Sequence, residues 1–121
     1  MNIFQEIYTV TGRLNRGRFF KYYVLVTIMG ATATFVTSCM DTLLTGDPNG
    51  SLVKMITVTW AVLATAGACM LMARRLHDLD KNGGFFLISF IPVVGLIFMV
   101  YLFFKEGTVG YNKYGADPLE T

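Results

Sequence analysis

The densest group of ionisable side chains inside the apolar part of this sequence is Arg74-Arg75-Leu76-His77-Asp78. Asp78 follows Arg75 by three residues and Arg74 by four, so on a helix its carboxylate can reach either guanidinium. His77 is the single histidine, and one histidine does not make a metal site. No serine or cysteine stands at a spacing that would pair it with His77 as nucleophile and base. We therefore predict a structural clamp at the membrane surface, with no catalytic, cofactor-binding or metal-binding residues.

A second basic motif contains Gly12, Arg13 and Arg16 and is followed by aromatic residues. Arginines at this position can reach lipid phosphates while aromatic rings anchor at the level of the headgroups. We expect contact with membrane lipids here. Anchoring of the chain explains the motif, and a specific lipid site is the alternative.

The elements that position these motifs are three uncharged windows, each of 19 or 20 residues, at 22–40, 55–73 and 85–104. A bilayer core of about 30 Å needs about 20 helical residues. Helices of a soluble bundle would each need a polar face, and these windows lack one. The sequence therefore predicts an all-α membrane protein with three transmembrane helices in a single integral domain, 1–121.

Positive charge is distributed unevenly around these windows. Seven Lys and Arg residues lie before the first window or between the second and third, and three lie elsewhere. Because positive residues are retained in the cytoplasm, we expect the N-terminus and the Arg74 motif to be cytoplasmic. Three crossings would then place the loop at 42–53 and the C-terminal tail outside.

Two shorter features complete the outline. Ile3, Phe4, Ile7 and Tyr8 recur at helical spacing, which predicts a short N-terminal helix lying in the membrane interface. Pro92 interrupts the third window, which predicts a kinked crossing. The alternative is a re-entrant hairpin that turns at Pro92 and returns the tail to the cytoplasm. Its limbs, about ten residues each, would be too short to cross.

Small residues recur four apart in the first two windows, at Gly30 and Thr34 and at Ala64 and Ala68. Small and hydroxyl residues at this spacing let helices approach closely in lipid. We expect these faces to pack on each other or on another copy of the chain.

Three motifs together resemble the YhaH-like proteins, a bacterial inner-membrane family with a domain of unknown function. The central motif at 74–78 matches the family signature, and 12–20 and 107–118 are similar to its N-terminal and tail motifs. The chain departs from the family at Asp80, where glycine is frequent, and at Gly84 and Phe85, where tryptophans are. The resemblance implies a small multi-pass protein of the bacterial inner membrane and brings no known reaction.

The net charge of +2 is too small to indicate nucleic-acid binding. We expect a non-enzymatic membrane component that acts by association with itself or with a membrane protein partner. The alternative is a small oligomeric channel or transporter component, with the Arg74 motif at its inner mouth. The absence of charge inside the three windows counts against that alternative, because ion paths usually contain charged side chains.

Overall fold

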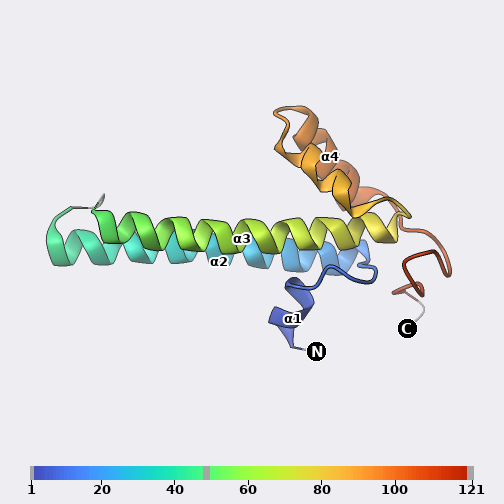
Figure 1. Ribbon diagram of the computed structural model, residues 1–121, viewed down its shortest axis with the longest axis horizontal. Helices are drawn as coiled ribbons and strands as arrows, with labels where there is room; N and C mark the ends of the chain where they lie inside the picture. The colour runs from blue at the N-terminus through green and yellow to red at the C-terminus, as the bar shows by residue number, and fades with distance from the viewer. Residues whose placement is uncertain (1, 48–49, 120–121) are drawn as a thin grey trace.

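The computed structural model describes residues 2–47 and 50–119, and these residues are largely helical (Figure 1). In chain order the elements are α1 (Ile3–Ile7), α2 (Arg16–Thr45), α3 (Ser51–Asp78), the 3-10 helix η1 (Gly83–Phe90) and α4 (Val94–Phe104). No β-strand forms in the described part of the chain, where one isolated bridge joins Asn112 and Gly115. The prediction of an all-α chain is confirmed.

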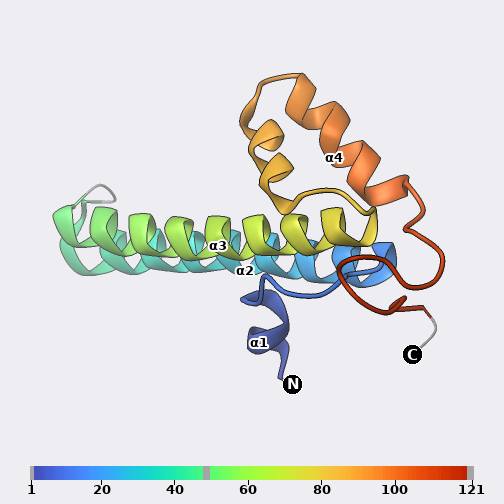
Figure 2. The ribbon, with the colours of Figure 1, turned by 45° about the vertical axis from the view of Figure 1, so that its right-hand side comes forward.

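Helices α2 and α3 lie side by side as a long antiparallel hairpin (Figures 1 and 2). α2 has 30 residues and α3 has 28, and each is long and apolar enough to cross a membrane. α2 begins where the Asn15 side chain accepts a hydrogen bond from the Arg18 N–H, and ends before Gly46, which has φ of 73°. The first two predicted windows lie within these helices.

Small residues set the distance between the two long helices. A Cβ added to Gly30 would lie 3.2 Å from the Cβ of Ala64 on α3, so the backbones approach closely at this level. The predicted small-residue faces therefore pack on each other within one chain.

The third window does not form the one kinked helix predicted over 85–104, and whether this segment crosses the membrane stays a prediction. It is divided into η1 and α4, which fold back on each other (Figure 2). Pro92 has no N–H to continue a helix, and Val93 turns the chain with φ of 66° while the Val94 N–H donates to the Pro92 carbonyl at 2.7 Å. α4 has 11 residues and is about 16 Å long, roughly half the hydrocarbon thickness. Two helices of membrane length and one shorter apolar helix are formed.

Both ends of this apolar hairpin lie at the same end of α3. Gly83 lies against His77, where an added Cβ would be 3.0 Å from Nε2. At the other end, Arg75 donates to the carbonyls of Leu102 and Lys105. The tail therefore starts beside the Arg74 motif. The prediction that it lies on the opposite side of the membrane from the N-terminus stays a prediction.

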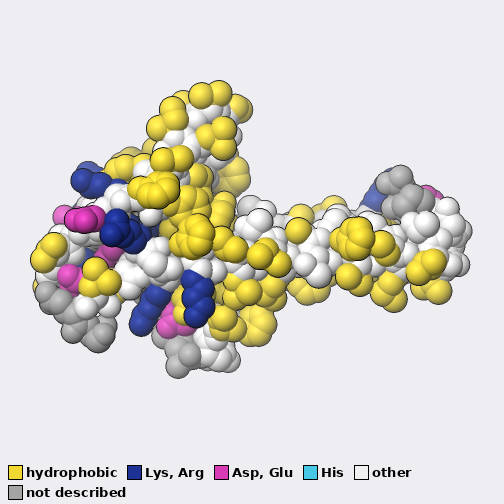
Figure 3. All heavy atoms as spheres, turned by 180° about the vertical axis from the view of Figure 1, so that it is seen from behind, with side chains coloured by type: hydrophobic (Ala, Val, Ile, Leu, Met, Phe, Trp, Pro, Cys, Tyr) yellow, Lys and Arg dark blue, Asp and Glu magenta, His cyan; other side chains and the backbone are white. Residues whose placement is uncertain are grey.

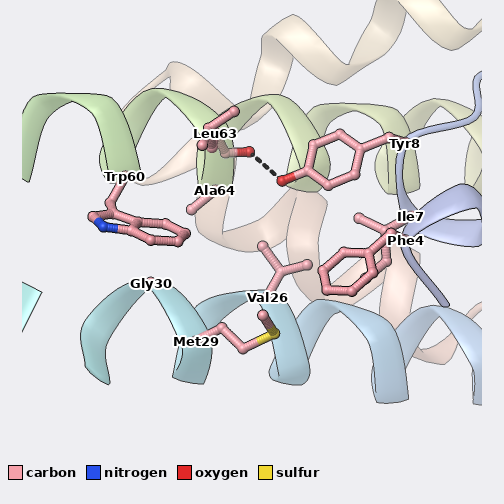
Figure 4. A pocket seen from close by; sticks show the side chains of 9 residues that line it. All are labelled: Phe4, Ile7, Tyr8, Val26, Met29, Gly30, Trp60, Leu63 and Ala64. Carbon is pink, nitrogen blue, oxygen red and sulfur yellow. Dashed lines mark hydrogen bonds between the residues drawn. The ribbon is translucent and has the colours of Figure 1, made fainter. Parts of the chain in front are cut away.

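The predicted N-terminal helix is present as α1, with Asn2 and Gln5 forming a reciprocal capping box. It packs across the hairpin, where the Tyr8 hydroxyl donates to the Leu63 carbonyl at 2.9 Å. Figure 4 shows these side chains around a small apolar cavity between α1, α2 and α3, with Trp60 at the side away from α1. The contact anchors α1 to α3.

Candidate functional site

Charged side chains gather over one end of the hairpin, where α1, the start of α2 and the tail meet (Figure 3). At the centre of this end is Asp78, the last residue of α3, which is 3% exposed. Arg75 Nη1 lies 2.5 Å from its Oδ2, and Arg13 Nη2 lies 3.0 Å from its Oδ1. One buried carboxylate is thus shared by two buried guanidinium groups. We call Arg13, Arg75 and Asp78 the polar clamp.

Arg75 joins three segments of the chain and is fully buried. Besides Asp78, its guanidinium donates from Nε to the Leu102 carbonyl at 2.9 Å, from Nη1 to the Leu14 carbonyl at 3.3 Å and from Nη2 to the Lys105 carbonyl. These acceptors belong to the N-terminal segment and to the end of α4. Arg75 therefore fixes both segments to the end of α3.

Arg13 holds the tail in the same way. Its Nη1 donates to the carbonyls of Gly110 at 2.5 Å and Gly115 at 3.2 Å, and its Nη2 donates to the Thr108 carbonyl. Arginine suits this task because its planar guanidinium presents five donors at fixed angles. The tail wraps around the Arg13 side chain, which is 1% exposed.

Gly107 permits the tail to pass directly over Asp78. A Cβ at Gly107 would overlap the Asp78 carboxylate, so a larger residue does not fit without displacing it. The next residue, Thr108, donates its N–H to the Asp78 carbonyl at 2.7 Å. This close approach accounts for glycine at the start of the tail motif.

A second carboxylate, Asp117, closes the tail into a loop. The Leu119 and Gly110 N–H groups each donate to it at 2.9 Å. These two backbone donors favour the charged form and hold the pKa of the Asp117 carboxyl below its usual range. The tail is thus ordered by hydrogen bonds, which is consistent with its low apolar content.

His77 supports the same junction from the neighbouring position. Its Nδ1 lies 3.0 Å from the Gly12 carbonyl oxygen, and because a carbonyl only accepts, Nδ1 carries the proton. Its ring stacks on Tyr114 with centroids 4.0 Å apart and planes at 9°. Gly12 has φ of 86°, a conformation that favours glycine. His77 therefore links the N-terminal segment to the tail.

The two remaining arginines of the predicted site lie at its edge. The pair of Arg74 with Asp78 that the spacing allowed is not formed. Arg74 Nη1 instead donates to the Glu6 carbonyl at 2.6 Å and lies 3.4 Å from Glu6 Oε2. Arg16 is exposed, and its Nη1 donates to the Phe104 carbonyl at 3.3 Å.

The candidate residues therefore lie together at one end of the hairpin. The two basic motifs of the sequence thus contribute to one shared site. The tail residues that complete it were not predicted: Gly107, Thr108, Asn112 and Tyr114. Their glycine-rich motif was visible in the sequence, but nothing local shows that its carbonyls face Arg13. Among the described residues, no group of three or more His, Cys, Asp or Glu side chains is placed to hold a metal ion.

A small cavity of about 220 Å³ lies beside the clamp, between Arg16 and the tail. Ligand pockets usually measure about 300–1,000 Å³ and are largely apolar. This one is smaller and is lined partly by the carboxylates of Asp78, Glu106 and Asp117. Its size and acidic lining suit water better than an organic ligand.

Comparison with known proteins agrees with the membrane character of the fold. The family described as "Protein of unknown function (DUF805)" matches residues 7–116. The inner membrane protein YhaI of Escherichia coli K12 is 29% identical over 118 residues, which cover 98% of this chain and 92% of YhaI. The inner membrane protein YhaH of the same strain is 29% identical over 98 residues, which cover 81% of this chain and 80% of YhaH. No solved structure matches. The chain is thus a membrane protein in contact with lipid and is similar to the inner membrane proteins YhaI and YhaH, and it belongs to the DUF805 family.

Proposed function

We propose that this protein is a non-enzymatic component of the bacterial inner membrane, in which the polar clamp is structural. The observation that carries the proposal is the shared Asp78 carboxylate, 3% exposed between Arg13 and Arg75. The two guanidinium groups also make six hydrogen bonds to backbone carbonyls, three from each arginine. Side chains engaged in this way hold the chain together and offer little to a substrate.

The same engagement counts against a permeation role for the motif. An ion path through the Arg74 motif would need side chains that face a water-filled cavity. Arg75 and Asp78 are instead paired with each other, and although Asp78 also lines the small cavity beside the clamp, their side chains are only 0% and 4% exposed. Catalysis on lipid meets the same objection, because a general acid or base must reach the group that it protonates.

For the topology, we propose two crossings, by α2 and α3, and an apolar hairpin of η1 and α4 that enters and leaves on the clamp side. This arrangement strengthens the charge argument. Of the ten Lys and Arg residues, Lys54 alone then lies at the far end of the hairpin, in the first turn of α3, so the division becomes nine to one. Retention of positive charge supports a cytoplasmic clamp with both termini on that side.

For association, we propose that the open face of the α2–α3 hairpin receives a further membrane helix, from a second copy or from a membrane protein partner. A shallow groove of about 680 Å³ runs along this face and is lined mainly by small and hydroxyl side chains, among them Ala31, Thr34, Ser38, Thr65 and Ala68. Such side chains favour close helix packing in lipid. Gly30 and Ala64 lie at the floor of the groove, where they already hold α2 and α3 together.

A matched pair of variants tests association. Ala31→Leu fills the groove, whereas Thr32→Leu places a leucine at the next residue of α2, which is exposed and does not line the groove. We expect Ala31→Leu to lower the fraction of oligomer or of partner complex seen by cross-linking in native membranes, and Thr32→Leu to leave it unchanged. A parent protein that gives no cross-linked species, or equal loss in both variants, would remove the support for this proposal.

A further inference from the structure

The end of the hairpin opposite the clamp holds a buried carboxylate whose role the clamp does not explain. Asp41, one turn before the end of α2, is 8% exposed, and its Oδ2 has no hydrogen-bond partner within the described part of the chain. A buried carboxylate without a partner is costly, so such groups are normally paired or bound to a metal ion. Asp41 therefore calls for a positively charged partner.

Three oxygen atoms converge at this place around Gly50, just before α3. A Cβ added to Gly50 would lie 3.0 Å from Asp41 Oδ2, 3.7 Å from the Asp47 carbonyl oxygen and 3.8 Å from Asp47 Oδ2. Because Gly50 has no side chain, no Cβ of its own enters the space between these oxygens, of which the Asp47 carbonyl also accepts a hydrogen bond from the Gly50 N–H at 3.4 Å. Two carboxylate oxygens and one carbonyl oxygen thus face one small cradle, which we call the Gly50 cradle.

Negative charge also gathers at this end of the hairpin. The last turn of α2 contains no basic residue, although the C-terminal end of a helix carries a partial negative charge. Asp41 and Asp47 add two formal charges there. The nearest cation in the sequence is Lys54, whose side chain is exposed. A cation seated among the three oxygens would compensate the helix terminus and the buried carboxylate of Asp41 together.

We propose that the Gly50 cradle binds a divalent cation of the Ca²⁺ class. Ca²⁺ takes carboxylate and backbone carbonyl oxygens in irregular geometry and accepts waters for its remaining positions. Mg²⁺ demands near-octahedral geometry, which two carboxylates and one carbonyl, from α2 and the residue after its cap, do not impose. The cation joins the end of α2 to the loop before α3 and so closes the hairpin at the end remote from the clamp. With few charged ligands, its Kd falls in the weak range of about 10⁻⁴–10⁻³ M.

The test is Ca²⁺ binding to the full-length protein in detergent, after treatment with EGTA, by calorimetry and by the thermal unfolding midpoint. We expect one Ca²⁺ per chain and a midpoint that rises with Ca²⁺ but not with NaCl of equal ionic strength. At ten times Kd, binding to the folded state alone raises the folded-to-unfolded ratio about elevenfold.

Three variants identify the ligands. Asp41→Asn abolishes the response, and Asp47→Asn, at an exposed loop residue whose replacement does not disturb the helix packing, weakens it. Asp80→Asn, an exposed acid beyond the other end of α3, keeps the full response. In EGTA, Asp41→Asn is at least as stable as the parent, because it lacks the buried charge.

Two results would overturn the proposal. One is no stoichiometric binding by the parent at about 10 mM Ca²⁺, ten times the weakest Kd expected. The other is a parent protein whose unfolding midpoint does not change with Ca²⁺ but is lowered by Lys54→Ala, which would identify Lys54 as the partner of Asp41.

Discussion

Replacing Asp78 by asparagine should destabilise this protein strongly, because it removes the one negative charge shared by two buried arginines. The substitution keeps the size of the side chain, so its effect reports charge and hydrogen bonding. In the variant, Arg13 and Arg75 remain buried at 6% and 0% exposure with no carboxylate between them. They then repel each other across the position that Asp78 occupied.

The expected magnitude follows from the burial of the pair. Breaking a buried ion pair by removing one partner costs about 3–5 kcal/mol, because an uncompensated charge stays behind. Here the six backbone carbonyls continue to accept hydrogen bonds from the two arginines. We therefore expect Asp78→Asn to lower the free energy of unfolding by about 3–5 kcal/mol, and not by twice that amount for its two pairs.

The assay is a double-mutant cycle with Arg13→Met, measured by SDS unfolding in mixed micelles and followed by the fluorescence of Trp60, the single tryptophan. Arg13→Met should cost less in the Asp78→Asn background, because it relieves the repulsion from Arg75. A coupling energy of about 1–3 kcal/mol is expected for such neighbours. The control is Arg18→Gln, an exposed arginine in the first turn of α2, which should stay within about 0.5 kcal/mol of the parent.

The reasoning would be refuted by either of two results. One is an Asp78→Asn variant within about 1 kcal/mol of the parent, far below the cost of a broken buried pair. The other is additivity of the two substitutions within about 0.5 kcal/mol, which is what independent sites give.

Two backbone predictions follow from the tail and from the hairpin turn. Gly107→Ala should lower the free energy of unfolding by at least about 1–3 kcal/mol, because its Cβ would overlap the Asp78 carboxylate. The control is Gly17→Ala in the first turn of α2, whose added Cβ makes only an ordinary contact at 3.6 Å, so the variant should be as stable as the parent or more stable. Thermal unfolding of the two variants checks this. Val93→Gly should leave the midpoint equal or higher, because a branched residue at φ of 66° carries about 1–2 kcal/mol of strain, whereas Val94→Gly at the first residue of α4 should cost up to about 1 kcal/mol. A lower midpoint for Val93→Gly than for Val94→Gly would contradict the strained turn.

The two long helices could be predicted from the sequence because their signal is local. Uncharged windows of membrane length identified α2 and α3, although both helices run past the windows into polar residues at each end. The third window is also uncharged, but whether it forms one helix or a hairpin depends on contacts that its composition does not reveal. Arg75 binds the carbonyls of Leu102 and Lys105, which secures the return of α4. Pro92 indicated where the helix would be interrupted, but not that α4 would fold back toward the end of α3.

The site was predictable where its partners are close in sequence. The spacing of Arg75 and Asp78 gave the pair that forms, and close by in sequence the Asn82 side chain caps η1 by accepting a hydrogen bond from the Gly84 N–H. Arg13 lies 65 residues from Asp78, and no periodicity indicates that contact. Asp80 has φ of 58°, a conformation that favours glycine, and Asp is one of the few other residues that tolerate it.

The most direct test of the central claim, that the clamp gathers both ends of the chain on one side of the membrane, is cysteine accessibility in oriented vesicles. Val10→Cys and Val109→Cys, exposed in the N-terminal segment and in the tail, are compared with Ser51→Cys at the far end of the hairpin, each in protein lacking Cys39 and Cys69. An impermeant thiol reagent should label the first two from the same side and Ser51→Cys from the other. Labelling of Val109→Cys from the same side as Ser51→Cys would contradict the account, because it would require the third apolar segment to cross the membrane.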